Sequence, residues 1–373
     1  MIYFDAAATT LQKPPQVFSA VQRAMQTCAS VGRGGHAAAQ AAAERVFDCR
    51  MEAARLFDAQ TEQVVFTMNA THGLNIAIRS VVPEGARVVT SGFEHNAVTR
   101  PLYALRAEVV AAGRRLFDTQ ELLEGFEAAL RQGASAAVCT HCSNVFGYVL
   151  PIEEISGLCR RYRVPLVIDA SQSAGTLPVS LKKSGAAFIA MPGHKGLYGP
   201  QGTGILLCAD GGEPLLFGGT GTNSREAQMP DFLPDRLEAG THNVCGLAGL
   251  AEGLRYVRRR TPTGILQHEL SLKKRLEREL RELDELRLYA ARQQNGVLSF
   301  TVRGEDCEEF ARRLASYGVA VRAGLHCAPQ AHRTVGTLDD GTVRVSFSDF
   351  NTIQEVHSFA QICKKLLRNR KNW

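Results

Sequence analysis

From about residue 15 to about residue 255 the chain alternates between short apolar runs and longer stretches with helical spacing of apolar residues. The apolar runs are nearly continuous, which is typical of strands that are buried on both faces of a parallel sheet. Helix-like stretches such as Pro151–Cys159 separate them. The pattern predicts an α/β domain built on a mostly parallel, doubly wound sheet. The predicted strands are Val64–Thr67, Arg87–Thr90, Ala136–Thr140, Leu166–Asp169, Ala187–Ala190 and Gly204–Cys208.

The pattern changes near residues 255–265. The segment Arg258–Gly264 combines consecutive arginines with proline and glycine, and it predicts a linker. A long charged helix is predicted over Gln267–Leu283. We expect a large domain over 15–255 and a smaller α+β domain made of 1–14 and 256–373. The further elements predicted in the small domain are strands over Gly296–Thr301 and Thr342–Ser346 and helices over Asp306–Tyr317 and Ile353–Arg368.

The composition is that of a globular chain that can bury a large core: it has 373 residues, 45% of them hydrophobic, and a mean hydropathy of −0.11. No apolar run approaches a membrane span, and Met1–Asp5 does not open a signal peptide. The net charge of +6 is mild, and the basic run Lys364–Lys371 is interpreted as the solvated end of a helix. We therefore expect a cytoplasmic protein that binds neither membrane nor nucleic acid.

Ten cysteines in a chain of this length do not indicate a disulfide scaffold. Several lie in apolar patterns, which predicts small buried side chains in a reducing compartment. Cys139 and Cys142 have the spacing of a redox or metal pair, but no second pair of ligands follows at a suitable distance. We interpret the two residues as a strand end that runs into a loop, and we expect no metal site.

Polar residues follow five of the predicted strands at their carboxyl ends. In a parallel sheet these ends lie at one edge, where ligands bind. We therefore expect one convergent site rather than five separate loops. Its expected members are Asn69, Ala70, Thr71, Glu94, His95, Asn144, Asp169, Gln172, His194 and Lys195.

Asp169 and Lys195 form the pair that pyridoxal phosphate (PLP) chemistry requires. Lys195 follows an apolar run between Gly193 and Gly196, and its amine can form a Schiff base with the cofactor aldehyde. A strand-end aspartate can keep the pyridinium nitrogen protonated, so that the ring accepts electrons. Taken singly, a lysine is more often a solvated charge and an aspartate a helix cap. Their combination favours a PLP site.

The segment Asn69–Gly73 opens a predicted helix directly after a strand. Backbone N–H groups and the helix dipole there favour a phosphate, although a plain helix cap fits equally well. His95 can stack on a flat ring and move protons, and Gln172 and Asn144 can hydrogen-bond a ring hydroxyl or the substrate. The alternative for each of these three is an ordinary polar loop residue, and for Asn144 a turn former.

The small domain contributes an arginine and a cysteine in the loop Arg322–Ala328. A guanidinium binds a carboxylate through a bidentate fork, which suits an amino-acid substrate. Cys327 lies outside any apolar pattern, and a thiol on such a loop is a candidate nucleophile. With PLP, these two residues suggest an enzyme that takes sulfur from an amino acid.

These motifs form an ordered set along nearly the whole chain: Tyr3–Thr10, Glu94–Ala97, Ser143–Asn144, Asp169–Gln172, His194–Lys195, Glu238–Thr241 and Arg322–Ala328. The set resembles the cysteine desulfurase family, within aminotransferase class V and the fold-type I PLP enzymes. The resemblance implies a large domain with a mostly parallel sheet, a smaller α+β domain, and a cytoplasmic homodimer with shared active sites.

The resemblance also implies a cofactor site. Lys195 would bond PLP covalently, and His95 would stack on its ring. Asp169 would pair with the pyridinium nitrogen and Gln172 with the ring oxygen. The expected phosphate contacts are Ala70, Thr71, His194 and, from the other subunit, Thr241.

For the substrate, the resemblance implies that Arg322 binds the carboxylate of L-cysteine with the assistance of Asn144. Cys327 would attack the substrate sulfur, which leaves L-alanine and a persulfide on Cys327. The short loop around Cys327 resembles the group whose cysteine loop is compact. Members of that group hand the sulfur to a dedicated acceptor protein, for iron–sulfur cluster assembly or thiolation.

Two residues depart from the family pattern. Pro192 stands three residues before Lys195, where a serine or threonine usually helps to hold phosphate, and it has neither a hydroxyl nor an N–H. His72 stands where an acidic residue is frequent. PLP binding is still expected, with the phosphate either held more weakly or held by other residues of the site.

Three rival functions stay open at this point. A selenocysteine lyase, or another PLP-dependent C–S or C–Se lyase, would use the same fold and need not use Cys327. A non-catalytic sulfur-relay scaffold would need neither Lys195 nor Asp169. A plain aminotransferase or epimerase would leave Cys327 unexplained.

Overall fold

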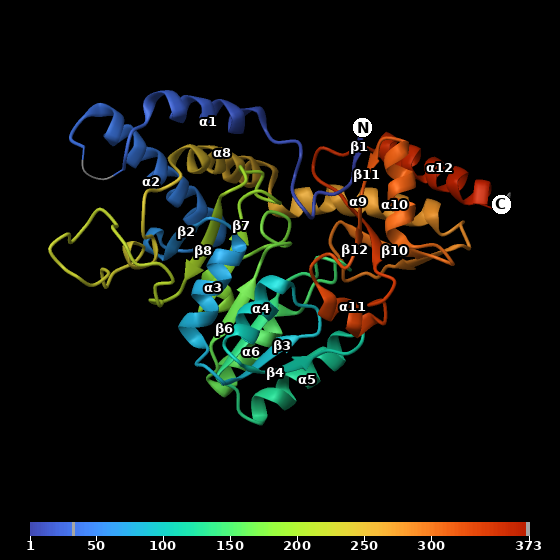
Figure 1. Cartoon of the computed structure of the whole chain (residues 1–373), viewed down its shortest axis with the longest axis horizontal. Coiled ribbons are helices and arrows are strands. Elements are labelled where there is room, and N and C mark those ends of the chain that lie inside the picture. Colours follow the sequence, from blue (N-terminus) through green and yellow to red (C-terminus); the bar gives the residue numbers. More distant parts are fainter. Residues whose placement is uncertain (32–33, 371–373) are drawn as a thin grey trace.

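The computed structural model describes residues 1–31 and 34–370. A seven-stranded sheet forms its centre, in the order β2-β8-β7-β6-β5-β3-β4 (Figure 1). The strands β7, β6, β5, β3 and β4 are parallel, and β8 runs antiparallel to both β7 and β2. The bounds are β2 Val64–Thr67, β3 Arg87–Ser91, β4 Glu108–Ala112, β5 Ala136–Thr140, β6 Leu166–Asp169, β7 Phe188–Pro192 and β8 Gly204–Cys208.

The six strands predicted for this sheet are confirmed to within two residues at their ends. The seventh, β4, was not predicted. It lies at one edge of the sheet, and most of its residues are exposed or half-buried, unlike those of β2 at the other edge. An edge strand needs no continuous apolar run, so the pattern that identifies buried strands does not detect it.

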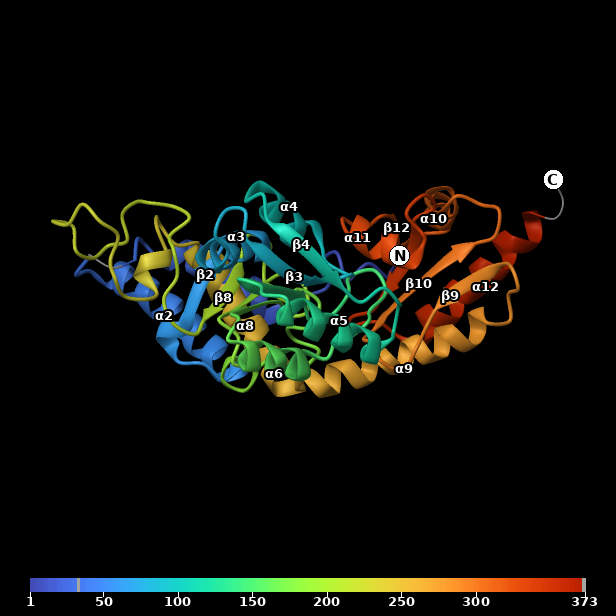
Figure 2. The ribbon, with the colours of Figure 1, turned by 90° about the horizontal axis from the view of Figure 1, so that it is seen from below.

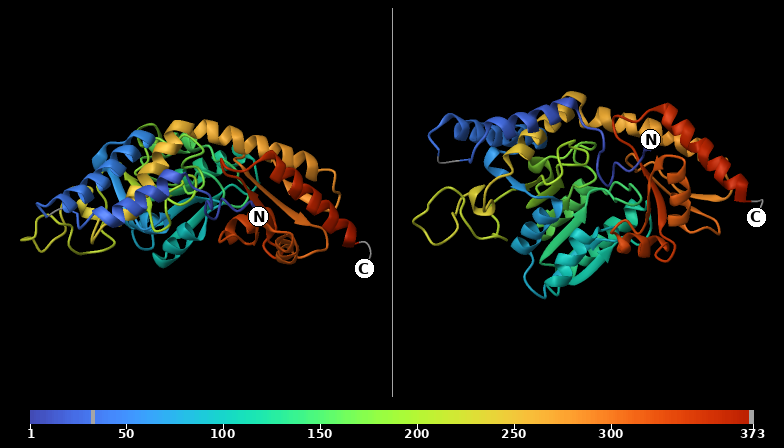
Figure 3. Two further views of the ribbon diagram at one scale, coloured as in Figure 1. Left: turned by 90° about the horizontal axis from the view of Figure 1, so that it is seen from above. Right: turned by 45° about the horizontal axis from the view of Figure 1, so that its top comes forward.

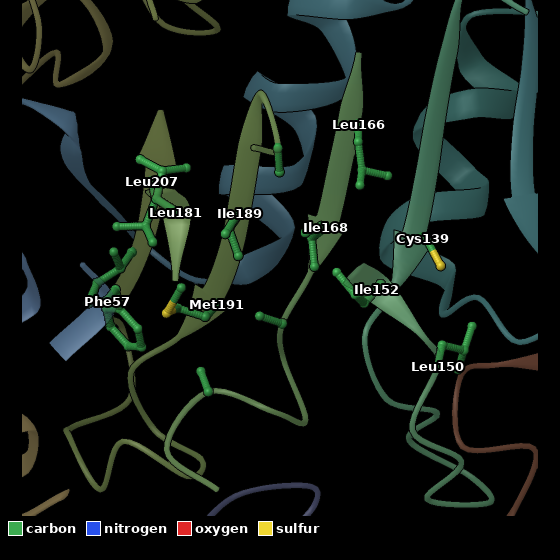
Figure 4. Packing of buried hydrophobic residues seen from close by; sticks show 14 of the residues in the cluster. Phe57, Cys139, Leu150, Ile152, Leu166, Ile168, Leu181, Ile189, Met191 and Leu207 are labelled. Carbon is green, nitrogen blue, oxygen red and sulfur yellow. The ribbon is translucent and has the colours of Figure 1, made fainter. Parts of the chain in front are cut away.

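Helices cover both faces of this sheet, which explains the continuous apolar runs. One face packs on α3 Ala70–Val81 and α4 Asn96–Ala104. Figure 4 shows part of the other face, where Leu166, Ile168, Ile189 and Leu207 point the same way from neighbouring strands. The helices on that face are α2 Ala37–Phe57, α5 Thr119–Arg131, α6 Ile152–Tyr162, the short α7 Leu181–Ser184 and α8 Val244–Arg260.

A second hydrophobic core lies around a four-stranded antiparallel sheet in the order β12-β13-β10-β9. Helices α9 and α12 pack side by side against it (Figures 2 and 3). The N-terminal strand joins this core, because Phe4 is completely buried in it and β1 pairs with β11. The bounds are β1 Ile2–Tyr3, β9 Leu286–Tyr289, β10 Val297–Val302, β11 Val319–Ala320, β12 Arg322–Gly324, β13 Thr342–Ser346, α9 Pro262–Leu280, α10 Cys307–Ser316 and α12 Ile353–Arg370.

The linker predicted over Arg258–Gly264 is wrong. Helix α8 ends at Arg260 and α9 begins at Pro262, so Thr261 alone joins them. The Thr261 hydroxyl accepts a hydrogen bond from the Gly264 N–H (3.0 Å), and proline is favourable in a first helical turn. Proline and glycine therefore start a helix here rather than interrupt one.

The remaining elements complete the chain. They are α1 Pro15–Thr27, α11 Pro329–Val335 and two short 3₁₀ helices, Thr61–Gln63 and Asp235–Leu237. Within the described residues, no helix combines the length and the apolar character needed to cross a membrane.

Replacing Phe4 by Ala should lower the free energy of unfolding by about 3–5 kcal/mol, because the change leaves a cavity in the second core. Urea unfolding followed by circular dichroism measures the change. Ile353→Ala is the matched control: that side chain is 60% exposed, so its loss should alter stability by less than about 0.5 kcal/mol. Equal effects of the two changes would contradict the assignment of Phe4 to the core.

Candidate active site

A cavity of about 100 Å³ lies at the carboxyl ends of the parallel strands. Most of the predicted site residues line it, as one convergent site requires. Glu94, Arg322 and Cys327 are not on its wall, and neither is Thr241. The predicted residues on the wall are Asn69, Ala70, Thr71, His95, Asn144, Asp169, Gln172, His194 and Lys195, and Pro192 also lines the cavity.

The first turn of α3 forms one end of the cavity. Its cap is Asn69, whose side-chain oxygen accepts a hydrogen bond from the His72 N–H (2.9 Å). The turn fits closely against β8, because a Cβ on Gly204 would lie 2.8 Å from the Asn69 carbonyl carbon. Backbone N–H groups at such a helix start favour an anion, as expected for a phosphate.

Asp169 ends β6 and is almost fully buried. One of its oxygens accepts a hydrogen bond from the Ser171 N–H (2.9 Å). Lys195 follows the neighbouring strand β7. Burial lowers the pKa of Lys195 to about 8, Asp169 opposes this effect, and Arg344 and Arg322 add to it. The amine is therefore much closer to its nucleophilic neutral form at physiological pH than an exposed lysine is.

The N-terminal segment holds the loop that carries Lys195. The His194 carbonyl accepts hydrogen bonds from the Thr9 and Thr10 hydroxyls (3.2 and 3.0 Å). The His194 ring lies 3.0 Å from the same Thr9 hydroxyl. A Cβ on Gly196 would collide with the Ala174 carbonyl oxygen, so that glycine is required for the close fit of the loop.

His95 caps α4 with its ring. Its Nδ1 accepts a hydrogen bond from the Ala97 N–H (3.0 Å), which leaves the proton of a neutral ring on Nε2. Burial lowers the pKa of His95 to about 4, although Asp169 opposes the shift. The ring is therefore neutral at physiological pH, and Nε2–H is its available donor.

The loop of Cys327 is hydrogen bonded to Asn144 of the cavity wall and to Asn96, which follows His95 in the chain. Asn144 Nδ2 donates to the carbonyl of His326 (2.7 Å), and the Asn96 N–H donates to the carbonyl of Cys327 (2.8 Å). The thiol itself is exposed and accepts from Arg322 Nη2 at 3.6 Å. The nucleophile predicted from the sequence is thus fixed by its backbone next to the cavity, with a guanidinium beside its sulfur.

Arg344 is a site residue that the sequence analysis missed. It lies on β13 directly opposite Arg322 on β12 and is fully buried. Its guanidinium donates to Asp5 Oδ1 (2.7 Å) and to the Asn144 carbonyl (2.9 Å). A charged residue within the apolar strand Thr342–Ser346 was the available signal, because a strand charge that points inward needs a partner.

Gln172 makes a hydrogen bond other than the expected one, and Thr241, which was expected to act at the site of the other subunit, lies outside the cavity of its own chain. Gln172 lines the cavity, but its amide donates to the Ala7 carbonyl (3.0 Å). Thr241 lies instead on a surface cavity of about 980 Å³. The loop that carries it is anchored through Glu238, which accepts a bidentate ion pair from Arg50 (3.0 and 2.8 Å) and a hydrogen bond from His242 (2.7 Å).

The residues of the cavity fit PLP. The cavity has a helix start for the phosphate at one end, the Asp169 carboxylate for the ring nitrogen, and an amine of lowered pKa for the aldehyde. Asn144 adds a buried amide oxygen that has no hydrogen-bond partner within the described residues. Pro192 lines the cavity without offering a donor.

Comparison with known proteins shows the family to which the chain belongs. The family described as Aminotransferase class-V matches residues 2–359. A probable cysteine desulfurase from Pyrococcus abyssi is 30% identical, over 100% of this chain and 96% of that protein. One from Methanothermobacter thermautotrophicus is also 30% identical, over 98% of this chain and 94% of that protein. The chain belongs to the cysteine desulfurase family of aminotransferase class V.

The structure of a cysteine desulfurase from Thermococcus onnurineus NA1 is 32% identical in sequence, with a TM-score of 0.90. The likeness covers 99% of this chain and 95% of that one. The fold-type I architecture expected from the sequence is therefore confirmed. Enzymes of aminotransferase class V use PLP, and this chain supplies a site that fits it.

The lowered pKa of Lys195 predicts how fast the cofactor-free protein bonds PLP. Only the neutral amine reacts, so the rate should reach half of its maximum near pH 8 rather than near 10.5. Asp169→Asn removes an effect that raises the pKa and should move this midpoint down. Arg322→Gln removes an effect that lowers the pKa and should move it up.

Borohydride trapping at a series of pH values, followed by mass spectrometry of the Lys195 peptide, measures the midpoint. Lys182, which lies in the short helix α7 outside the cavity, is the internal control for labelling away from the cofactor site. Shifts of the same sign in both variants would contradict the assigned charges.

Proposed function

We propose that this protein is a PLP-dependent cysteine desulfurase that converts L-cysteine to L-alanine and forms a persulfide on Cys327. The observation that carries the proposal is the docking of the Cys327 loop. The exposed Cys327 thiol lies beside a guanidinium. The carbonyls of His326 and Cys327 accept hydrogen bonds from Asn144 and Asn96 at the edge of a cavity that fits PLP. An aminotransferase or epimerase has no use for a thiol held in this way.

In this proposal Lys195 binds the cofactor covalently, Asp169 pairs with the ring nitrogen, and His95 covers the ring. When bound, PLP supplies an electron sink for the pair of electrons released at the substrate carbon. Ala70, Thr71 and His194 bind the phosphate at the start of α3. Gln172 reaches the ring oxygen only if its bond to Ala7 is exchanged.

Arg322 and Arg344 receive the substrate carboxylate. They lie opposite each other on neighbouring strands, and both are close enough to Lys195 to lower its pKa. A guanidinium binds a carboxylate through two parallel N–H groups. Arg322 is the less buried of the two, and Asn144 assists from the cavity wall.

The Cys327 thiolate attacks the sulfur of the substrate. A bond forms between the two sulfur atoms while the carbon–sulfur bond breaks, and the electron pair of that bond remains on carbon. A proton must then reach this carbon, and His95 Nε2 and Lys195 Nζ are the groups on the cavity wall that can carry it. A thiol of an acceptor protein takes up the terminal sulfur and restores Cys327.

A homodimer with shared active sites completes the proposal. Thr241 lies on the same surface cavity as Phe47 and Phe217, which are 53% and 78% exposed. Apolar side chains of this size are usually covered when they gather on one surface. Figure 1 shows this region at the end of the molecule that is distant from the small sheet. A second copy seated there would bring Thr241 towards the phosphate of its partner.

Several finer points belong to the same proposal. The ten cysteines all lie within the described residues and none is paired, which suits a reducing cytoplasm. Residues 15–255 would form the large domain, and 1–14 with 256–373 the small domain that carries Arg322 and Cys327. The persulfide would supply iron–sulfur cluster assembly or thiolation.

The rival functions are less well supported. The similar proteins are named cysteine desulfurases, which does not favour a selenocysteine lyase. A sulfur-relay scaffold would need no buried lysine with a lowered pKa.

Cys327→Ala should abolish alanine release from L-cysteine, with a loss of about 10³-fold or more, because it removes the sulfur nucleophile. Alanine and sulfide are measured with PLP and a thiol reductant present. Cys245→Ala, at a half-buried cysteine on α8, is the control and should retain activity. A Cys327→Ala enzyme that still desulfurates L-cysteine, or a wild-type enzyme that cleaves only selenocysteine, would contradict the proposal.

Shared active sites predict complementation between two inactive variants. Lys195→Ala and Thr241→Ala homodimers should both be impaired, the first completely. A mixed dimer contains one site with an intact Lys195 and an intact Thr241 from the other chain. Mixing after mild dissociation should therefore restore up to about a quarter of the wild-type rate, since half of the dimers are mixed and each has one good site. No recovery in dimers shown to be mixed would place Thr241 at the site of its own chain.

A further inference from the structure

Glu94 is a buried carboxyl beside the active site that has no role in the reaction proposed above. It follows β3 and is completely buried. Its oxygens accept hydrogen bonds from the Ser91 hydroxyl, the Ser91 N–H (3.2 Å) and the Thr140 N–H (3.0 and 3.1 Å). The donors belong to the ends of β3 and β5, which are neighbours in the sheet.

The hydrogen bond from the Thr140 N–H to Glu94 lies where the backbone of β3 no longer pairs with β5. The β3–β5 ladder ends with Thr90 opposite Val138, and the chain then turns towards α4. Thr140 lies beyond that ladder, and its N–H bonds the Glu94 carboxyl instead. On its other side Thr140 pairs with Asp169 of β6. Glu94 therefore fixes the turn relative to Asp169.

The same turn also holds the cysteine loop. From α11, Gln330 Nε2 donates to the Ser91 carbonyl (3.2 Å) and the Thr334 hydroxyl donates to the Gly92 carbonyl (2.8 Å). The Asn96 N–H donates to the Cys327 carbonyl. Gly92 permits the close fit, because a Cβ there would collide with the Gly113 carbonyl oxygen.

We propose that Glu94 is a positioning residue: by holding the turn 91–96 on the end of β5, it sets the places of His95 and Cys327 relative to Asp169. The inference deepens the proposed desulfurase function and rests on it. His95 is the next residue in the chain, and the Cys327 carbonyl accepts a hydrogen bond from the Asn96 N–H at the end of the turn. A shift of the turn therefore moves the proton carrier and the nucleophile together.

The hydrogen bonds show which property of Glu94 matters. Glu94 Oε1 accepts hydrogen bonds from the Ser91 hydroxyl, the Ser91 N–H and the Thr140 N–H, and Oε2 accepts from the Thr140 N–H, so the carboxyl acts as an acceptor in each. Glutamine keeps the shape of the side chain but replaces one acceptor with an N–H₂ group. With the N–H₂ group at the Oε2 position it would face the Thr140 N–H, which weakens the contact with β5 without leaving a cavity.

The test compares three variants of the holoenzyme. Glu94→Gln weakens the hydrogen bonding on the β5 side of the turn, Gln330→Ala cuts one link on the cysteine side, and Glu269→Gln is a control at another buried carboxyl, on α9. Three quantities are measured for each: alanine release from L-cysteine, circular dichroism of the bound cofactor, and deuterium exchange at the Asn96 amide.

Glu94→Gln should lower kcat/KM about tenfold with little change in KM, because the displaced groups act in the chemical steps. It should also weaken the dichroism of the cofactor and speed exchange at Asn96 about tenfold. Gln330→Ala should speed exchange and leave the dichroism unchanged. Glu269→Gln should change none of the three.

A double-mutant cycle separates positioning from a general weakening of the fold. If Glu94 acts through both His95 and Cys327, the change to Gln should cost less in a His95→Ala background than in the wild type, because only the displacement of Cys327 remains there. A full loss in that background, or unchanged dichroism and exchange in Glu94→Gln, would overturn the inference. If the wild-type protein releases no alanine, the proposed function fails, while the dichroism and exchange of Glu94→Gln still decide the role of Glu94.

Discussion

The ion pair between Asp5 and Arg344 joins parts of the chain that are far apart in sequence. Arg344 lies on the small sheet, Asp5 on the N-terminal segment, and the same guanidinium donates to the Asn144 carbonyl after β5. A buried guanidinium deprived of its partner would destabilise the fold by about 3–5 kcal/mol. The N-terminal segment is therefore held where it passes the cavity, and its threonines fix the His194 backbone there. The geometry around the reactive lysine thus depends on an interaction outside the cavity.

Burial and the neighbouring arginines affect both the protonation of this site and its affinity for anions. It lowers the pKa of Lys195 and keeps His95 neutral, because charged forms lose hydration. Arg344 and Arg322 bring positive charge to the cavity, although Asp169 and Asp5 oppose their effect on the amine. Such a cavity favours anions, and a cofactor phosphate and a substrate carboxylate both bring negative charge. The positive potential that assists binding is thus also one cause of the reactivity of the lysine.

Much of the large sheet and the cavity wall could be predicted from the sequence, because strands covered on both faces require continuous apolar runs and their ends share one edge. Strand β4 was not predicted, because it lies at an edge and has no continuous buried apolar run. The role of Arg344 was not predicted, because its ion-pair partner Asp5 is more than three hundred residues away in the chain. The junction at Thr261 was misjudged because proline and glycine also suit a first helical turn. Such local signals are ambiguous until the tertiary partners are known.

The backbone at Cys327 has a thermodynamic consequence. His326 and Cys327 both have positive φ, 50° and 56°, a region that costs a residue with a Cβ about 1 kcal/mol relative to glycine. The bonds to Asn144 and Asn96 use main-chain carbonyls, so glycine at position 327 would preserve them and relieve the strain. Selection for stability alone would therefore favour glycine there. The thiol is a stability–activity compromise, and thermostability engineering that ignores catalysis would remove it early.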